Sequence, residues 1–201
     1  IGANHLEGHV FSNWLPKKIR TSHVLNIKFP AVCLMVSGGH TILLSMQSLT
    51  KWKILGETRD DAVGEAFDKV AKMLGLPYPG GPEVEKLTKS YYYHSDRIGS
   101  NKLIEFPRPM IYDKNYDFSF SGLKTSVLYY LKGNKSITTH DREIRYMSKN
   151  SRLVNKVCAS FQKAAVDVLT HKTIKAVEEF KAKSVLLCGG VAANKALQKE
   201  L

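Results

Sequence analysis

Apolar residues form two runs of strand length, at 31–36 and 41–46, on either side of a short polar turn. The turn over 37–40 reads SGGH, and a glycine-containing turn of this length between two apolar runs is typical of a β-hairpin. Residues 52–55 predict a third strand. The short apolar run 184–188 predicts a buried strand near the end of the chain.

Helical periodicity follows the third strand. Residues from about 60 to 74 predict a helix with Asp60 or Asp61 as its N-cap and Gly75 as the residue that ends it. The predicted buried side of this helix consists of Ala62, Ala66, Val70 and Met73. Three further helices are predicted over 4–15, 122–131 and 151–180, the first of them ended by Pro16.

The other segments are predicted to be irregular or short. We expect a basic linker over 16–30, a rigid stretch rich in proline and glycine over 77–82, a tyrosine-rich region without clear periodicity over 83–115, and a charged connection over 133–150. Residues 117–121 alternate between polar and apolar side chains, which predicts a strand.

Two glycine pairs stand next to predicted strands. Gly38 and Gly39 lie in the hairpin turn, while Gly189 and Gly190 follow the last strand, where a helix is predicted to start. Paired glycines let backbone amides approach an anion, and a strand that leads through a glycine turn into a helix is a place where nucleotides bind. One such pair would most simply be a structural turn. The second pair favours two sides of a cleft for an adenylated ligand.

The composition is that of a globular protein. The chain has 201 residues, 43% hydrophobic and 24% charged, with no apolar stretch long enough to cross a membrane and no visible secretory signal. Cys33, Cys158 and Cys188 lie in apolar surroundings, so we expect buried free thiols in a reducing compartment and therefore a cytoplasmic protein. Because the chain lacks an initiator methionine and stops at Leu201 within a predicted helix, we expect a fragment of a longer protein.

The net charge of +12 is concentrated in one part of the chain. Residues 97–156 carry twelve Lys and Arg against five Asp and Glu, with tyrosines interleaved among them. A concentrated basic region suits a polyanion such as RNA. An ordinary lysine-rich surface explains the charge equally well.

His5 and His9 are four residues apart in a predicted helix and therefore share one face. Two imidazoles at this spacing can bind one metal ion, although a pair of surface histidines is the simpler interpretation. Glu7 does not directly follow the first histidine, so the segment is not the metallopeptidase signature.

An acidic stripe is predicted on the helix that follows the third strand. Asp61, Glu65 and Asp68 lie on one face, and such a stripe either binds ribose hydroxyls or is solvated.

Nine short segments together resemble one protein family, the tRNA threonylcarbamoyladenosine transferases of the bacterial TsaD type. They are NHLEGH (4–9), VSGGHT (36–41), LGET (55–58), DDA (60–62), GEAFDK (64–69), YPGGP (78–82), FSFSGLKT (118–125), ASFQ (159–162) and GGVAAN (189–194). They occur in the family's order and cover nearly the whole chain, so we expect this chain to be a fragment of such a transferase.

The resemblance implies an α/β fold of the two-lobed actin/hexokinase-like (ASKHA) type. Residues 1–29 would be the end of the first lobe and would carry the metal-binding helix. Residues 30–201 would be most of the second lobe, with an insertion over about 77–150 and a truncated C-terminus.

The family's activity is the transfer of a threonylcarbamoyl group from threonylcarbamoyl-AMP to the exocyclic amine of the adenosine beside the anticodon of tRNA. This acyl transfer forms threonylcarbamoyladenosine. The resemblance also implies helper subunits, namely a paralogous actin-like subunit and an ATPase subunit, and no membrane partner.

The resemblance further implies roles for individual residues. His5 and His9 would bind one divalent metal ion per subunit, iron or zinc, with an aspartate expected beyond Leu201 as the third ligand. His40 would carry a proton during catalysis. The implied substrate-binding residues are Met35, Val36, Ser37, Gly38, Gly39, Asp68, Gly81 and Asn194.

Two other functions are compatible with the same residues. One is a zinc-dependent metallopeptidase, or glycoprotease, which would cleave a protein substrate without a nucleotide. The other is a non-catalytic adenylate-binding subunit of an assembly. We also expect the 201-residue chain alone to be inactive, because the third metal ligand and most of the first lobe would be absent.

Overall fold

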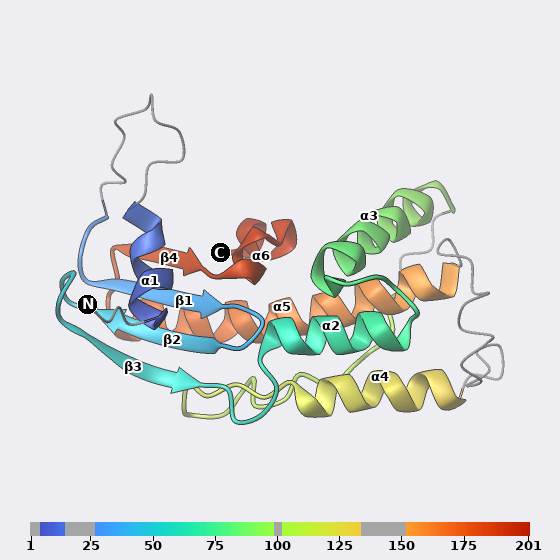
Figure 1. Cartoon of the computed structure of the whole chain (residues 1–201), viewed down its shortest axis with the longest axis horizontal. Coiled ribbons are helices and arrows are strands. Elements are labelled where there is room, and N and C mark those ends of the chain that lie inside the picture. Colours follow the sequence, from blue (N-terminus) through green and yellow to red (C-terminus); the bar gives the residue numbers. More distant parts are fainter. Residues whose placement is uncertain (1–4, 15–26, 99–101, 134–151) are drawn as a thin grey trace.

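The computed structural model describes residues 5–14, 27–98, 102–133 and 152–201, and within them a four-stranded sheet lies beside a group of helices (Figure 1). The strands are β1 (Ala31–Val36), β2 (Thr41–Met46), β3 (Trp52–Glu57) and β4 (Ser184–Cys188). Their order in the sheet is β3-β2-β1-β4. β2 is antiparallel to both β1 and β3, and β4 is parallel to β1. The described chain is therefore of mixed α/β class, as the resemblance implied.

Helices cover both faces of the sheet and extend beyond its end (Figure 1). They are α1 (His5–Phe11), η1 (Ser12–Trp14), α2 (Val63–Met73), α3 (Gly80–Ile98), α4 (Ser121–Gly133), α5 (Arg152–Glu179), η3 (Gly190–Ala193) and α6 (Lys195–Glu200). The short helix α1 crosses one face of the sheet. The long helix α5 runs along the other face and continues beyond the strands to contact α3.

Strand β1 is buried on both faces, which explains why it reads as an uninterrupted apolar run. Val32, Leu34 and Val36 point into the larger core, which the sheet shares with the helices beyond it. Cys33 and Met35 point to the other face and pack in a smaller cluster with Val10 of α1 and its neighbours. This alternation follows from the period of two along a strand.

The hairpin, the third strand, the final strand, and the helices predicted over 122–131 and 151–180 are confirmed. The helix predicted to end at Gly75 is confirmed as well, and Gly75 has the positive φ of 67° that a helix-ending glycine adopts. Cys33, Cys158 and Cys188 are buried free thiols, as predicted. Burial raises the pKa of the Cys158 thiol to about 12.

Helix α3 was not predicted, since residues 83–115 were expected to lack clear periodicity. Besides Gly80, the buried residues in the described part of α3 are Val84, Leu87, Thr88 and Tyr91, which do have helical spacing. Thr88 is polar and Tyr91 carries a hydroxyl group, so the apolar stripe is too thin to be recognised from the sequence. The helix is stabilised by packing against α2 and α5.

Three local predictions are wrong. Residues 117–121 do not form a strand, because Phe118 makes a single bridge to Thr58 and the alternation serves to bury Phe118 and Phe120. Neither Asp60 nor Asp61 caps α2, whose N-cap position is Ala62. The chain after Gly189 forms a 3-10 turn first, and the helix α6 starts at Lys195.

Some predictions fall outside the described residues. These are the helix boundary at 15–16, most of the linker over 16–30, and most of the connection over 133–150. In the part of the chain that is described, none of the helices combines the length and the apolar character needed to cross a membrane.

Candidate functional site

The two glycine turns meet at one end of the sheet. Strands β1 and β4 are parallel neighbours, so the turn after Val36 and the turn after Cys188 both leave the sheet at the carboxyl ends of these strands. Contact between them is close, because a methyl group on Gly189 would overlap the Val36 carbonyl group. Helix α2 contacts the first turn through Gly64, whose amide donates to the Ser37 carbonyl oxygen at 3.2 Å. The predicted cleft between two glycine turns therefore has a structural basis.

A hollow of about 350 Å³ opens at this junction. Four of the residues implied by the family resemblance line it, namely Gly38, Asp68, Gly81 and Asn194. The lining also includes Gly190 of the second glycine pair and residues that sequence reasoning missed: Gly64, Phe67, Tyr78, Glu85 and Val191. For Tyr78, the predicted rigid stretch over 77–82 was the available sequence signal. Glu85 lies on the unpredicted helix α3.

Asp68 connects α2 with the start of α3. Its Oδ1 accepts a hydrogen bond from the Gly80 amide at 2.7 Å. A carboxylate at the N-terminus of a helix is stabilised by the amides and the helix dipole there. Asp68 thereby holds Gly81, the next residue of α3, at the wall of the hollow.

Asn194 is buried, and both polar atoms of its side chain make hydrogen bonds. Its amide nitrogen donates to Gln162 Oε1 at 2.9 Å, and its Oδ1 accepts from the Ala196 and Leu197 amides at 3.0 and 3.1 Å. The residue therefore caps α6 and anchors the second glycine turn to the long helix α5.

The hairpin turn is fixed by Ser37 and His40. The Ser37 amide donates to the His40 carbonyl oxygen at 2.8 Å, and the His40 amide donates to Ser37 Oγ at 3.0 Å. Between them Gly38 and Gly39 are exposed, and a methyl group on either would meet no atom within 4 Å. The open face of this turn is suited to the close approach of a ligand.

Four of the implied substrate-binding residues are not among those that line the hollow: Met35, Val36, Ser37 and Gly39. Met35 and Val36 are fully buried in β1, with side chains on opposite faces of the sheet. The Ser37 hydroxyl is engaged within the turn. Met35, Val36 and Ser37 therefore support the turn, whereas Gly39 is exposed within it.

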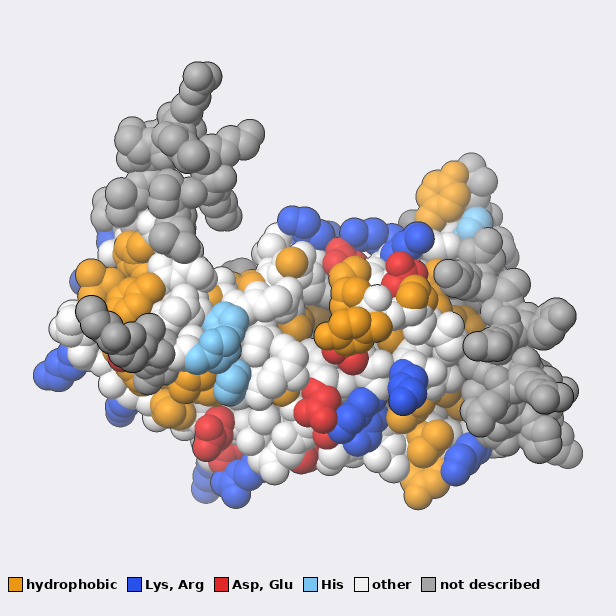
Figure 2. Space-filling view, viewed as in Figure 1, with side chains coloured by type: hydrophobic (Ala, Val, Ile, Leu, Met, Phe, Trp, Pro, Cys, Tyr) orange, Lys and Arg blue, Asp and Glu red, His pale blue; other side chains and the backbone are white. Residues whose placement is uncertain are grey.

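The structure brings three histidines together. The ring centroids of His5 and His9 are 4.6 Å apart, and those of His5 and His40 are 5.8 Å apart. Figure 2 shows a patch of histidine side chains between α1 and the hairpin turn. Burial, followed by the proximity of His5 and His40, lowers the pKa of His9 below its ordinary value. This shift favours the neutral imidazole, the form that binds metal ions.

Among the residues that the structure describes, no group of three or more His, Cys, Asp or Glu side chains is arranged to hold a metal ion. The side chains of His5 and His9 do lie side by side, and His40 lies near His5. A third ligand must come from elsewhere if this pair binds a metal.

Lysines neutralise most of the predicted acidic stripe. Lys69 Nζ lies 2.7 Å from Asp61 Oδ1 and 2.7 Å from Glu65 Oε1, and Lys124 Nζ lies 2.6 Å from Asp61 Oδ2. Partial burial raises the pKa of Asp61, but the hydrogen bonds from Lys124 and Lys69 outweigh it, and the pKa is lowered. Asp68 alone of the three acids lines the hollow between the glycine turns.

Asp60 ties the end of the sheet to α4. Its carboxylate accepts from the hydroxyls of Ser119 and Ser121, both at 2.6 Å, and from the amides of Phe120 and Ser121 at 2.8 and 3.2 Å. Partial burial raises the pKa of Asp60, but these four hydrogen bonds outweigh it, so the pKa is lowered from its ordinary value. Asp60 thus acts on the N-terminus of α4 and not on that of α2.

We expect Asp60→Asn to destabilise the fold at pH 7 by about 1–2 kcal/mol, because an amide NH₂ cannot accept the two serine hydroxyls. The lowered pKa means that the carboxylate stabilises the fold above its ordinary pKa and loses this effect as the pH falls through the lowered value. The difference from wild type should therefore shrink in strong acid. Urea unfolding at pH 7 and pH 3 measures it, with the exposed Glu105→Gln as control. A difference that persists unchanged at low pH would contradict a role for the charge.

A family model described as TsaD, tRNA N6-adenosine threonylcarbamoyltransferase, matches residues 1–201. Three curated relatives carry the same description. The protein of Thermosipho melanesiensis is 47% identical over 198 residues, which are 98% of this chain and 51% of the relative. Those of Clostridium perfringens and Moorella thermoacetica are 45% and 46% identical over 203 residues, which are all of this chain and 52% and 51% of the relatives. The chain spans about half the length of the curated relatives it matches.

Proposed function

We propose, because the chain belongs to the tRNA N6-adenosine threonylcarbamoyltransferase (TsaD) family, that the protein transfers a threonylcarbamoyl group from threonylcarbamoyl-AMP to the exocyclic amine of the adenosine beside the anticodon of tRNA. One observation carries this proposal beyond family membership. The two glycine turns, which are far apart in the sequence, meet at a hollow that also contains Asp68, Gly81 and Asn194.

The hollow is suited to the adenylate donor. A methyl group on Gly38 or Gly190 would meet no atom within 4 Å, so a phosphate can approach the backbone of both turns. Asp68 supplies a carboxylate oxygen on the same wall, where it can accept a hydrogen bond from a ribose hydroxyl.

The transfer step joins the acceptor amine to the acyl carbon. A C–N bond forms, the C–O bond to the phosphate breaks, AMP leaves, and the amine loses one proton. The glycine-turn amides stabilise the negative charge on the leaving phosphate. His40, at the end of the first turn, is the proton acceptor in this proposal.

His5 and His9 would hold one divalent metal ion, iron or zinc. Two neighbouring imidazoles on consecutive turns of α1, one of them with a lowered pKa, fit two of the ligands of such a site. The third ligand in this proposal is an aspartate that follows residue 201. A bound metal ion would supply Lewis-acid polarisation of the acyl group.

The remaining parts of the proposal concern the whole protein. The described sheet and helices would belong to the second lobe of a two-lobed actin-like fold, with an insertion over about 77–150 and the metal-binding helix at the end of the first lobe. The tRNA would contact the basic region over 97–156, and the helper subunits would be an actin-like paralogue and an ATPase. The location would be the cytoplasm.

The test uses the protein extended at both ends to the length of its relatives, with helper subunits, threonylcarbamoyl-AMP, unmodified tRNA and divalent metal. Mass spectrometry should detect modified adenosine. Gly38→Val should lower the rate at least about 10-fold because it fills the open face of the turn. Gly133→Val should not, since Gly133 is on α4 and a Cβ added there also meets no atom within 4 Å.

Other outcomes identify the other functions. Chelator-sensitive cleavage of a protein without a nucleotide would indicate a metallopeptidase. Adenylate binding without any transfer would indicate a non-catalytic subunit.

A further inference from the structure

A second hollow, of about 430 Å³, adjoins the first. The two share Gly38, Asp68 and Tyr78, so the same residues form the partition between them. The second hollow continues along α2, where Glu65, Lys69 and Lys72 line it. A reaction between two nucleotide substrates needs two adjoining sites. The proposed function assigns the donor to the first hollow and leaves the acceptor without a site.

The two hollows differ in charge. The first is lined by glycines and apolar side chains such as Phe67 and Val191, together with Asp68 and Glu85. The second is lined by two lysines and by two carboxylates, Glu65 and Asp68, and Lys69 is paired with Asp61 and Glu65. Lys72 is exposed, and in the described part of the chain no carboxylate lies within ion-pair distance of its ammonium group. A cation at the edge of a hollow is suited to a phosphate of an RNA backbone.

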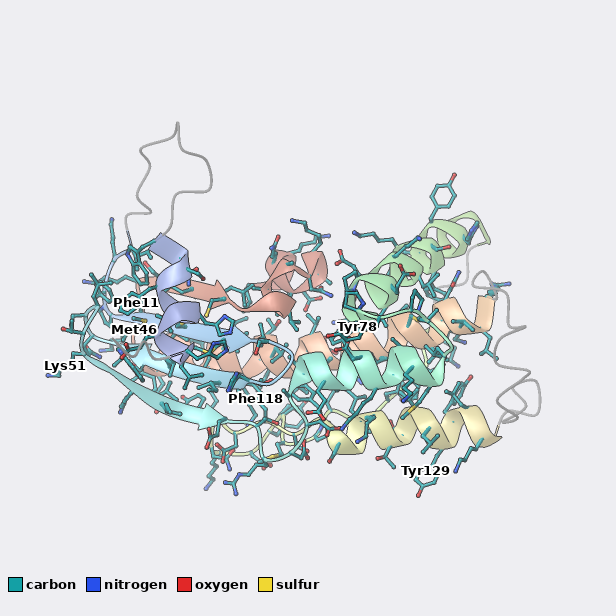
Figure 3. All side chains as sticks on the ribbon, viewed as in Figure 1. Phe11, Met46, Lys51, Tyr78, Phe118 and Tyr129 are labelled. Atoms are coloured by element: carbon teal, nitrogen blue, oxygen red, sulfur yellow. The ribbon has the colours of Figure 1, made fainter. Side chains whose placement is uncertain are left out.

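Tyr78 stands on the rim of both hollows with its ring in solvent. Its exposure of 84% is high for an aromatic residue, and prolines at 77 and 79 restrict the backbone on either side. Figure 3 places Tyr78 next to the start of α3 and over α2, well separated from Lys51 at the far end of the sheet. An exposed ring on a restrained loop is a stacking platform for an unpaired base, and such stacking contributes about 1–3 kcal/mol per base.

We infer that the second hollow receives the acceptor: Tyr78 stacks on a base of the single-stranded tRNA loop, and Lys72 contacts a backbone phosphate. This inference rests on the proposed function, in which the first hollow holds the donor. The acceptor amine and the acyl carbon can then meet at the residues that the two hollows share. Of the residues that line the two hollows, lysines occur only in the second, and Lys72 there is available to a phosphate of a polyanion.

The experiment measures both substrates separately in the full-length protein with its helper subunits. Tyr78→Ala should raise the KM for tRNA about 10-fold, a larger factor than its effect on the Kd of threonylcarbamoyl-AMP, because Tyr78 only borders the first hollow. Tyr78→Phe should behave as wild type, because the stacking ring is retained. Lys72→Gln should weaken binding of an anticodon stem-loop RNA and reduce the slope of log Kd against log salt by about one.

Lys51→Gln is the matched control, since it removes an exposed lysine remote from both hollows and should change neither constant. A weaker affinity for threonylcarbamoyl-AMP with an unchanged KM for tRNA would overturn the inference and assign the second hollow to the donor. Unchanged constants in Tyr78→Ala and Lys72→Gln, with transfer intact, would overturn it as well and leave the proposed function standing. A wild-type protein that transfers nothing would overturn the proposed function itself, and this inference with it.

Discussion

Gly189→Ala should destabilise the full-length protein by at least about 2 kcal/mol and abolish tight binding of the adenylate donor. The φ of Gly189 is 92°, a region that residues with a side chain rarely adopt. The added methyl group would also lie 2.7 Å from the Val36 carbonyl carbon, which belongs to the adjoining glycine turn. Relief of this overlap requires the two turns to separate, and the hollow between them would change shape. Urea unfolding and calorimetric titration with threonylcarbamoyl-AMP measure the two effects.

The neighbouring residue supplies the control. A methyl group on Gly190 would meet no atom within 4 Å, so Gly190→Ala should shift the free energy of unfolding by less than about 0.5 kcal/mol. Similar unfolding midpoints for the two variants would show that the turns do not depend on each other's close approach.

The elements that the sequence predicted correctly are those whose signal is local. The hairpin is two apolar runs with a glycine turn between them, and the helix α2 ends at a glycine with positive φ. The long helix α5 has many buried residues at helical spacing, so its sequence alone identifies it as a helix.

The elements that were mispredicted depend on contacts between distant residues. Thr88 and Tyr91 become core residues of α3 only because α2 and α5 pack beside that helix. Asp60 looks like a helix cap from its position in the sequence. The serines and amides of residues 119–121 compete for the same carboxylate, and in the structure they bind it.

The candidate site follows the same division. Each glycine pair was visible in the sequence, but their contact depends on the parallel pairing of β1 and β4, which no local pattern specifies. Asp68 was one of three acids on a predicted stripe. The structure separates it from Asp61 and Glu65 by giving those two residues Lys69 as a partner. Tyr78 and Glu85 reach the hollow because α3 begins beside it, and α3 was not predicted.

His5→Ala in the full-length protein should remove the bound metal ion and lower the rate of transfer by about 100-fold or more. His5 and His9 stand on consecutive turns of α1 with ring centroids 4.6 Å apart, so each is positioned to provide one ligand of a shared ion. Loss of one imidazole leaves a site with too few protein ligands for a catalytic metal, which usually has three. Because the His5 side chain is exposed, the fold should be preserved, with little change in the unfolding midpoint.

His171→Ala is the appropriate control for this variant. His171 is also exposed, but it lies on α5, where its ring contacts Tyr112 and not the histidines of α1. Metal content by mass spectrometry and transfer of the threonylcarbamoyl group should both match wild type in this control. If His5→Ala and His9→Ala each retain one metal ion per chain and full transfer, the pair is not a metal site, and its closeness to His40 must serve another purpose. If the metal is lost while transfer continues, the ion stabilises α1 against the sheet and takes no part in the reaction.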